Sequence, residues 1–271
     1  MTQKILKDDL LDKELLQNGF VVVPYLNEVE KEELLNFFYK HHQQGIPGFY
    51  ASAHVPDVTF RGNMNDKIKE VFSRATSAYF NHCKPLGGSF VVKSNEQKER
   101  LHPHQDWNIV DEEKYRSFNI WVPLVDLNDN NGIIRIMPKS HKWQKNYRGP
   151  GIADGFQQYH EEIWKNMVPL YMKAGQALIY DHRLFHASDP NITSQLRVAA
   201  VFGIIPDGAQ MYYYAGNNGK VEMYQSSLDF FMKENIQDGP KVLTKLAILE
   251  NPKPIASKWQ FHWTLIKSAF L

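Results

Sequence analysis

The chain changes at about residue 86 from helical spacing to a series of short strand-like segments, and this change limits the folds open to it. β-Branched and aromatic residues, bounded by turn residues, mark five such segments. They cover residues 88–93, 117–124, 132–137, 176–180 and 197–205. Helices followed by strands indicate an α+β protein. Short, mostly antiparallel strands that wrap one pocket form a jelly roll, so we expect a mainly β jelly roll whose open end holds a ligand.

The first 85 residues have the patterns of helices that support this sheet. Four leucines at positions 10–16 share one helical face before Asn18 and Gly19 end the pattern, and residues 20–24 are apolar and β-branched. Asn27 is a suitable N-cap for a second helix, and residues 65–83 return to helical spacing. We expect helix, strand, helix, and then a third helix that packs on the sheet.

The length and composition fit one globular domain. The 271 residues are 43% hydrophobic, enough to bury a sizeable core. We expect a single domain over residues 1–271, with a core at about 86–206, helical support at 1–85 and a C-terminal extension at 207–271 whose role the sequence does not indicate. Glycines and prolines among aromatics at 45–65 predict a long loop, which we interpret as a candidate lid.

Charge and cysteine usage favour a protein that acts on small molecules in the cytoplasm. Thirty-one basic and thirty acidic side chains leave a net charge of +1, which gives no field for nucleic acid or an anionic membrane. Cys83 is the one cysteine, as expected in a reducing compartment. Residues 1–17 lack the apolar run of a secretion signal, and no run approaches the roughly 18–20 residues that cross a bilayer. Nothing indicates the oligomeric state.

Two histidines and an aspartate have the ligand types of a metal centre. His104 and Asp106 are two residues apart, and His186 follows 80 residues later. Two imidazoles and one carboxylate on one face of a metal form the facial triad of non-haem Fe(II) oxygenases, which leaves the opposite face open. Arg197 follows in an apolar segment, where its guanidinium fork suits the carboxylate of 2-oxoglutarate. A surface arginine at the end of a strand is the alternative for Arg197.

Other histidines have structural interpretations. On a regular strand His102 shares a face with His104, so we expect it beside the metal ligands or in the pocket. His182 is expected to be structural. The remaining histidines are expected to lie at the surface, at caps or in satisfied buried positions; they are His41, His42, His54, His82, His141, His160 and His262.

Five separated blocks of sequence resemble the phytanoyl-CoA dioxygenase family over roughly residues 10–206. The entry block is Asn18-Gly19-Phe20-Val21-Val22-Val23-Pro24. The next three are Leu101-His102-Pro103-His104-Gln105-Asp106-Trp107, Asn119-Ile120-Trp121-Val122-Pro123-Leu124, and Asn130-Asn131-Gly132 followed by Met137-Pro138-Lys139-Ser140-His141. The last is Ala174-Gly175-Gln176-Ala177-Leu178-Ile179-Tyr180-Asp181, followed by His186-Ala187-Ser188-Asp189-Pro190-Asn191 and Arg197. Their order makes the resemblance specific.

The resemblance implies a double-stranded β-helix, which is a cupin-like jelly roll, and a dioxygenase that uses Fe(II), O2 and 2-oxoglutarate. Such an enzyme hydroxylates an unactivated carbon and releases succinate and CO2. By match to the family's motifs, His104, Asp106 and His186 hold the iron. Arg197 binds the distal carboxylate of 2-oxoglutarate with help from the Ser188 hydroxyl.

Three further residues acquire expected roles from the same resemblance. Lys93 occupies the position of a polar residue near the inner carboxylate of the co-substrate, with a solvated strand edge as its alternative. Gln105 and Trp121 are expected to line the co-substrate pocket, although Trp121, like Trp107 and Tyr180, equally suits a core position. The chain departs from the family at Lys139, where a glycine is commoner, but this concerns a turn and not the chemistry.

The substrate is not readable from the sequence beyond its class. No basic cluster suits the phosphates of an acyl-CoA, so we favour a small metabolite, such as an amino acid, another small acid or a lipid-like compound. Arg135 and Arg183 are candidates to bind a substrate carboxylate. Two other functions remain open on the same fold: a metal-dependent hydrolase or isomerase, and a non-catalytic metal-binding sensor.

Overall fold

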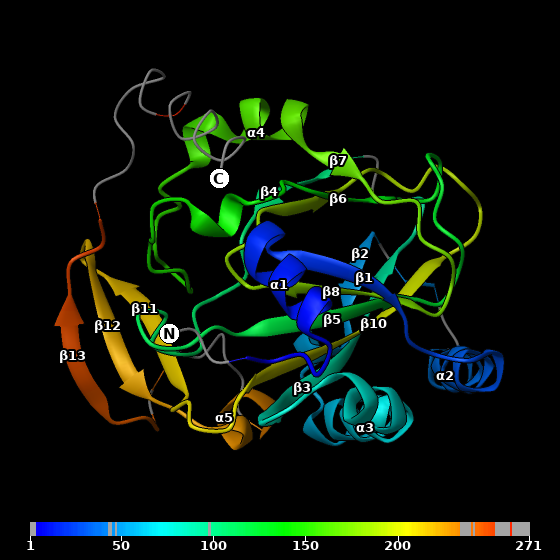
Figure 1. The fold of residues 1–271 in the computed structure, drawn as a ribbon, viewed down its shortest axis with the longest axis horizontal. Helices are drawn as coiled ribbons and strands as arrows, with labels where there is room; N and C mark the ends of the chain where they lie inside the picture. Colours follow the sequence, from blue (N-terminus) through cyan, green and yellow to red (C-terminus); the bar gives the residue numbers. More distant parts are fainter. Residues whose placement is uncertain are drawn as a thin grey trace.

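A computed structural model describes residues 4–42, 45–46, 48–96, 99–233, 240, 242–252 and 261. Two antiparallel sheets face each other, and a third lies beside them (Figure 1). The large sheet has the order β1-β8-β5-β10-β3-β2 and the small sheet the order β4-β9-β6-β7. The large sheet consists of β1 (Phe20–Pro24), β2 (Phe49–Ala51), β3 (Cys83–Lys93), β5 (Phe118–Pro123), β8 (Gln176–Asp181) and β10 (Arg197–Pro206). The small sheet consists of β4 (Leu101–His104), β6 (Ile134–Ile136), β7 (Val168–Pro169) and β9 (His186–Ser188). The expected mainly β jelly roll is confirmed.

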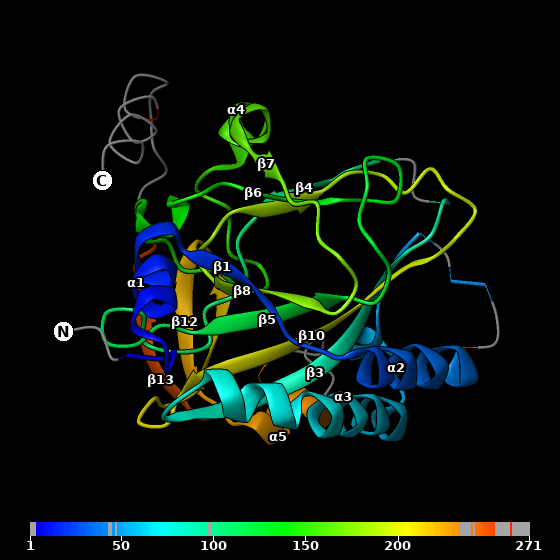
Figure 2. The same ribbon diagram turned by 45° about the vertical axis from the view of Figure 1, so that its right-hand side comes forward.

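Helices α1 (Asp9–Asn18), α2 (Glu28–His41) and α3 (Val58–Tyr79) cover the outer face of the large sheet, where α3 lies along β3 (Figure 2). Helix α4 (His160–Asn166) instead contacts β4 of the small sheet, and α5 (Leu228–Lys233) follows β12. Short 3-10 turns lie at Ser52–His54, Ser140–Lys142 and Gln157–Tyr159. Asn27 caps α2 as expected, because its side chain accepts the Glu30 N–H at 2.9 Å and the Glu30 carboxylate accepts the Asn27 N–H at 2.9 Å.

Alternation along the strands of the large sheet separates its two faces. On β10, Val198, Ala200 and Phe202 belong to the core shared with the helices. Ala199 instead belongs to the core between the two sheets, so the odd-numbered residues of this strand face inward. The same period places Arg197 on the inner face, away from the apolar core that the large sheet shares with the helices.

The predicted loop at 45–65 is wrong in both halves, since a short strand lies in the first and a helix begins in the second. Strand β2 pairs with the edge of β3, and α3 already begins at Val58, where the Asp57 side chain caps it by accepting the Phe60 N–H at 3.1 Å. With this cap the helix forms despite Gly62, because a glycine inside a helix lowers its stability by only about 1 kcal/mol relative to alanine. The helix also ends earlier than expected, at Tyr79, and residues 83–93 form one long strand.

The C-terminal extension adds a sheet of its own. Strands β11 (Tyr212–Asn217), β12 (Lys220–Gln225) and β13 (Lys245–Leu249) pair in that order beside the jelly roll (Figure 1). Between β12 and β13, helix α5 packs against α3 and β3. Among the described residues, no helix has the length and apolar character needed to cross a membrane.

Candidate active site

Two neighbouring strands of the small sheet bring the two candidate histidine ligands together. His104 at the end of β4 is the register partner of His186 at the start of β9, and their ring centroids lie 4.2 Å apart. The chain continues past β4 to Asp106, whose N–H donates to the carbonyl of His182 at 2.9 Å. One potential ligand atom from each of these three residues lies within 4.8 Å of the others. Residues 80 apart in sequence thus form the predicted cluster.

The imidazoles are held in the form that binds a metal. The Nδ1 atom of His104 lies 2.8 Å from the carbonyl of His102, and that of His186 lies 3.1 Å from the carbonyl of Leu184. Since a carbonyl only accepts, each Nδ1 carries the proton and each Nε2 keeps its lone pair. Burial and the neighbouring His186 lower the pKa of His104 to about 4. The donor set therefore fits a divalent metal at neutral pH.

Asp106 is oriented by an amide on the facing sheet. The side-chain amide of Asn119 on β5 donates to its Oδ2 at 2.9 Å, while Oδ1 lies 3.8 Å from the Nε2 atom of His186. Burial alone raises the pKa of Asp106, but the surrounding imidazoles, His186 above all, outweigh it and hold the pKa below its ordinary value. Asn119 was not expected to act here, although a polar residue at an inward position of an apolar strand is a usable signal.

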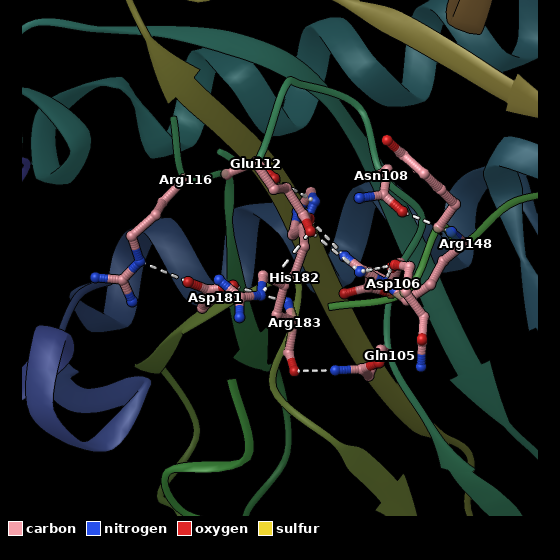
Figure 3. A network of polar contacts seen from close by, with 12 residues as sticks. Gln105, Asp106, Asn108, Glu112, Arg116, Arg148, Asp181, His182 and Arg183 are labelled. Atoms are coloured by element: carbon pink, nitrogen blue, oxygen red, sulfur yellow. Dashed lines mark hydrogen bonds and ion pairs between the residues drawn. The ribbon is translucent and has the colours of Figure 1, made fainter. Parts of the chain in front are cut away.

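A buried polar network fixes the backbone around Asp106 (Figure 3). The Arg148 guanidinium donates to the Asp106 carbonyl at 2.6 Å and forms a two-point ion pair with Glu112, at 2.5 and 3.1 Å. A second arginine, Arg183, lies 3.9 Å from the same carboxylate. Asn108 accepts the Arg148 N–H at 2.6 Å. The turn that carries Asp106 is therefore tied to the chain around Arg148 by charged, mostly buried groups.

Arg197 lies at the wall of a cavity that reaches the three ligands. The cavity has a volume of about 150 Å³ and is also lined by Trp121, Ser188 and Tyr180. Arg197 is 2% exposed, and no ion pair joins it to any residue within the described part of the chain. Its Nε has no hydrogen-bond partner, and burial lowers its pKa to about 10. The Trp121 ring lies 5.3 Å from the guanidinium carbon. A buried cation without a carboxylate is costly unless a ligand supplies one.

Lys93 is the register partner of Arg197, but its amine is directed elsewhere. The Nζ atom donates to the carbonyls of Ser188 and Asp189, at 3.1 and 2.6 Å. The side chain is fully buried and is not among the residues that line the cavity. Burial and the charge of Arg197 lower the pKa of Lys93 to about 7, and Asp189 only partly opposes this. The solvated-edge alternative is wrong, and Lys93 ties β3 to the end of β9.

Other expected residues lie away from the Arg197 cavity. The Gln105 amide donates to the carbonyl of Arg183 and faces a second, larger cavity. His102 is exposed and stacks on His160, because an irregularity in β4 between residues 101 and 104 breaks the alternation that the sequence predicted. His182 is buried, with its Nδ1 3.0 Å from the Ser117 hydroxyl, but its Nε2 has no hydrogen-bond partner within the described part of the chain and the residue lines the larger cavity.

The second cavity has a volume of about 430 Å³ and meets the Arg197 cavity at the ligands. Both are lined by His104, Asp106, Asn119 and Val201. The group of His104, Asp106 and His186 therefore has a small cavity with Arg197 on one side and a larger cavity on the other. Such a volume is within the range of pockets that bind drug-sized molecules.

Several solved structures have a fold similar to that of this chain. The epimerase SnoN from nogalamycin biosynthesis, in complex with Fe3+, alpha-ketoglutarate and nogalamycin RO, aligns with a TM-score of 0.56 and 18% identity over 92% of this chain and 96% of its own. The carbocyclase SnoK of the same biosynthesis aligns with a TM-score of 0.54 and 15% identity over 75% and 86%. HygX from Streptomyces hygroscopicus, with nickel and 2-oxoglutarate bound, has a TM-score of 0.51 and 15% identity over 74% and 88%.

These likenesses concern the fold, since all three are below 25% identity. No curated protein sequence matches the chain significantly. The sequence profile of the phytanoyl-CoA dioxygenase (PhyH) family, in contrast, matches residues 40–199, which is more than half of the chain. The matched span contains His104, Asp106, His186 and Arg197. This chain belongs to the phytanoyl-CoA dioxygenase family.

Proposed function

We propose that the protein is an Fe(II)- and 2-oxoglutarate-dependent oxygenase that hydroxylates an unactivated carbon of a small metabolite. The observation that carries the proposal is Arg197, a buried cation without a carboxylate partner among the described residues, in a cavity that ends at a cluster of two histidines and an aspartate. The two histidines and the aspartate would bind a metal. The buried guanidinium of Arg197 would bind the carboxylate of an acid beside it.

His104, Asp106 and His186 would hold Fe(II) through two Nε2 atoms and the Oδ1 oxygen. Iron bound in this way, with 2-oxoglutarate and O2, supplies the oxidising power for hydroxylation. The chain contributes orientation: main-chain carbonyls fix both imidazole tautomers, and the Asn119 amide fixes the carboxylate.

Arg197 would bind the distal carboxylate of 2-oxoglutarate through paired N–H donors. Ser188 on β9 and Trp121 on β5 line the same cavity, so a hydroxyl and an aromatic wall accompany the guanidinium. Lys93 would add positive charge to this end of the cavity without touching the ligand.

The comparisons support this function at the level of the cofactors. SnoN is described with Fe3+ and alpha-ketoglutarate, and HygX with nickel and 2-oxoglutarate. SnoN is an epimerase and SnoK a carbocyclase, so hydroxylation is proposed here from the family resemblance. A metal-dependent hydrolase on this fold would leave Arg197 without a ligand.

The test is anaerobic calorimetric titration of 2-oxoglutarate into the Fe(II)-loaded protein and into the Arg197→Met variant. Loss of charge-assisted hydrogen bonds should weaken binding by about ten- to hundredfold while Fe(II) still binds. Arg74→Met is the matched control, because Arg74 is exposed and pairs with Glu30 on the outer helices. Equal 2-oxoglutarate affinity in Arg197→Met and the parent protein would refute the proposal.

A further inference from the structure

The larger cavity beside the three candidate ligands is lined in part by His54, His182 and residues 201 and 203 of β10. Three further parts of the chain supply apolar or glycine residues. Strand β3 provides Leu86, Gly87 and Gly88, the segment after β4 provides Trp107 and Ile109, and α5 provides Phe231 and Met232. Helix α5 lies outside the span matched by the family profile, so this part of the wall belongs to the chain's own C-terminal extension.

Helix α5 is fixed in contact with the sheet rather than standing over an open gap. A Cβ atom built on Gly87, which has φ +135°, would lie 2.9 Å from the Sδ atom of Met232. The buried Arg61 of α3 donates from Nε to the carbonyl of Met232 at 3.2 Å and from Nη1 to the carbonyl of Val55 at 2.7 Å. The close approach of α5 therefore depends on the missing side chain at position 87.

Several polar side chains in the wall already have partners within the protein, whereas the buried Nε2 atom of His182 has none among the described residues. The Ser89 hydroxyl accepts the Ala53 N–H at 3.0 Å, and the amides of Gln105 and Asn119 donate to the Arg183 carbonyl and to Asp106. Apart from histidines and the proposed ligand Asp106, the described residues that line the cavity include no ionisable side chain.

The cations nearest to the turn that carries Asp106 are also neutralised. Arg148 pairs with Glu112, and Arg183 lies 3.9 Å from the same carboxylate. Arg135, the other candidate for a substrate acid, pairs with Asp189 at 2.9 Å and lies over the Trp164 ring. The described residues at this cavity therefore offer no free cation to a substrate carboxylate, and burial of an unpaired charge costs several kcal/mol.

We infer that the larger cavity takes an uncharged, mainly apolar part of the substrate, and that α5 selects for it through Phe231 and Met232. This inference rests on the proposed function, in that the cavity is the substrate side of the metal. It excludes free amino acids and small carboxylic acids as the group bound there. An uncharged ring or chain suits the wall because its transfer from water into apolar surroundings is favourable.

The test uses three probes with one skeleton and different charge: 2-naphthalenemethanol, 2-naphthoate and (2-naphthylmethyl)ammonium. Equilibrium dialysis against the full-length protein, with anaerobic Fe(II) and saturating 2-oxoglutarate, gives each Kd from naphthalene fluorescence of the two chambers. We expect the neutral probe to bind at least about tenfold more tightly than either ion, since even partial burial of an unpaired charge exceeds 1.4 kcal/mol. Equal or tighter binding of 2-naphthoate, or no binding of the neutral probe, would overturn the inference.

A charge placed on α5 locates the bound probe. Met232→Lys should weaken 2-naphthalenemethanol and strengthen 2-naphthoate by about tenfold each, whereas Met232→Leu should leave the order unchanged. Unchanged affinities in Met232→Lys would overturn the role of α5. The Fe(II)-dependent absorbance of bound 2-oxoglutarate, recorded on each variant, shows whether the metal site is folded. If the protein selects the neutral probe but does not bind 2-oxoglutarate, the proposed function is contradicted and the substrate class is not. If it binds 2-oxoglutarate but does not select the neutral probe, the substrate class is contradicted and the proposed function is not.

Discussion

Arg197 and Lys93 lie opposite each other on β10 and β3, so two basic side chains are buried side by side. The only described carboxylate near Lys93 is that of Asp189, which is already paired with Arg135. Such an arrangement destabilises the fold unless an anion is bound. We interpret the pair as an anion-binding site, because ionisable groups with perturbed pKa values gather at functional sites. The loss of folding stability is then the cost of binding the anion.

The first prediction concerns the pH dependence of stability caused by Lys93. Burial and Arg197 lower its pKa to about 7 from its ordinary 10.5. Between these values the unfolded chain holds a proton that the folded chain lacks, so this group makes the free energy of unfolding rise with pH, by at most about 1.4 kcal/mol per unit.

The measurement is denaturant unfolding of the parent protein and Lys93→Met, without ligand, at several pH values from 7 to 10.5. The difference between the two unfolding free energies should change steadily with pH in favour of the parent protein. A pH-independent difference would show that Lys93 keeps its ordinary pKa in the fold.

The second prediction concerns Asn119, which donates to the Oδ2 oxygen of Asp106 at 2.9 Å. Asn119→Leu removes the group that orients the carboxylate, so Fe(II) affinity should fall by about 10- to 100-fold. Asn166→Leu is the control, because Asn166 is exposed at the end of α4. Anaerobic competition with a colorimetric Fe(II) chelator measures both affinities. Equal affinity in the two variants would remove Asn119 from the metal site.

At the level of elements, the sequence predicted strands and helix starts that depend on residues close together in the chain. Residues 20–24 form β1 as expected, and the Asn27 cap starts α2. The start of α3 was missed because Asp57 caps the helix inside a stretch rich in glycine and proline. Strands β4 and β9 are four and three residues long, too short for a period of two to be read. These two strands carry His104 and His186, so the ligands were found by residue type and motif rather than by secondary structure.

The third prediction concerns the segment after β4, which Glu112 ties to the chain around Arg148. Glu112→Gln leaves the buried guanidinium of Arg148 without its charge partner, so the free energy of unfolding should fall by about 3–5 kcal/mol. The neighbouring Glu113→Gln should cost no more than about 1 kcal/mol, because Glu113 pairs with Lys145 in solvent.

Thermal or denaturant unfolding compares the two variants, and Fe(II) competition reports whether Asp106 has lost its position. We expect Glu112→Gln to weaken Fe(II) binding as well, since Arg148 donates to the Asp106 carbonyl. Parent-like stability in Glu112→Gln would show that the network does not support the turn.

Across the whole molecule, the site exists because two sheets present their inner faces to each other. The small sheet supplies His104, His186 and Ser188, and the large sheet supplies Asn119 and Arg197. The sequence named four of these five as site residues, but the distances between them depend on strand order and register, which no local pattern encodes. The C-terminal extension shows the same limit. Its placement of α5 beside Gly87 depends on packing across 145 positions of sequence and was not predicted.

We propose that residues 1–271 act as one domain, because α5 of the extension lines the same cavity as the metal cluster. A chain that ends after β10 should therefore lose the selectivity of the larger cavity even where the triad and Arg197 remain in sequence.

The central claim is that the cluster binds Fe(II) together with 2-oxoglutarate. The most direct measurement is an anaerobic titration of the Fe(II)-loaded protein with 2-oxoglutarate, followed by visible absorbance. The account predicts a saturable charge-transfer band from the chelated keto acid, absent in His186→Ala and shifted to higher 2-oxoglutarate concentration in Arg197→Met. Fe(II) binding with no band at saturating 2-oxoglutarate would contradict it and would favour a metal site with another function.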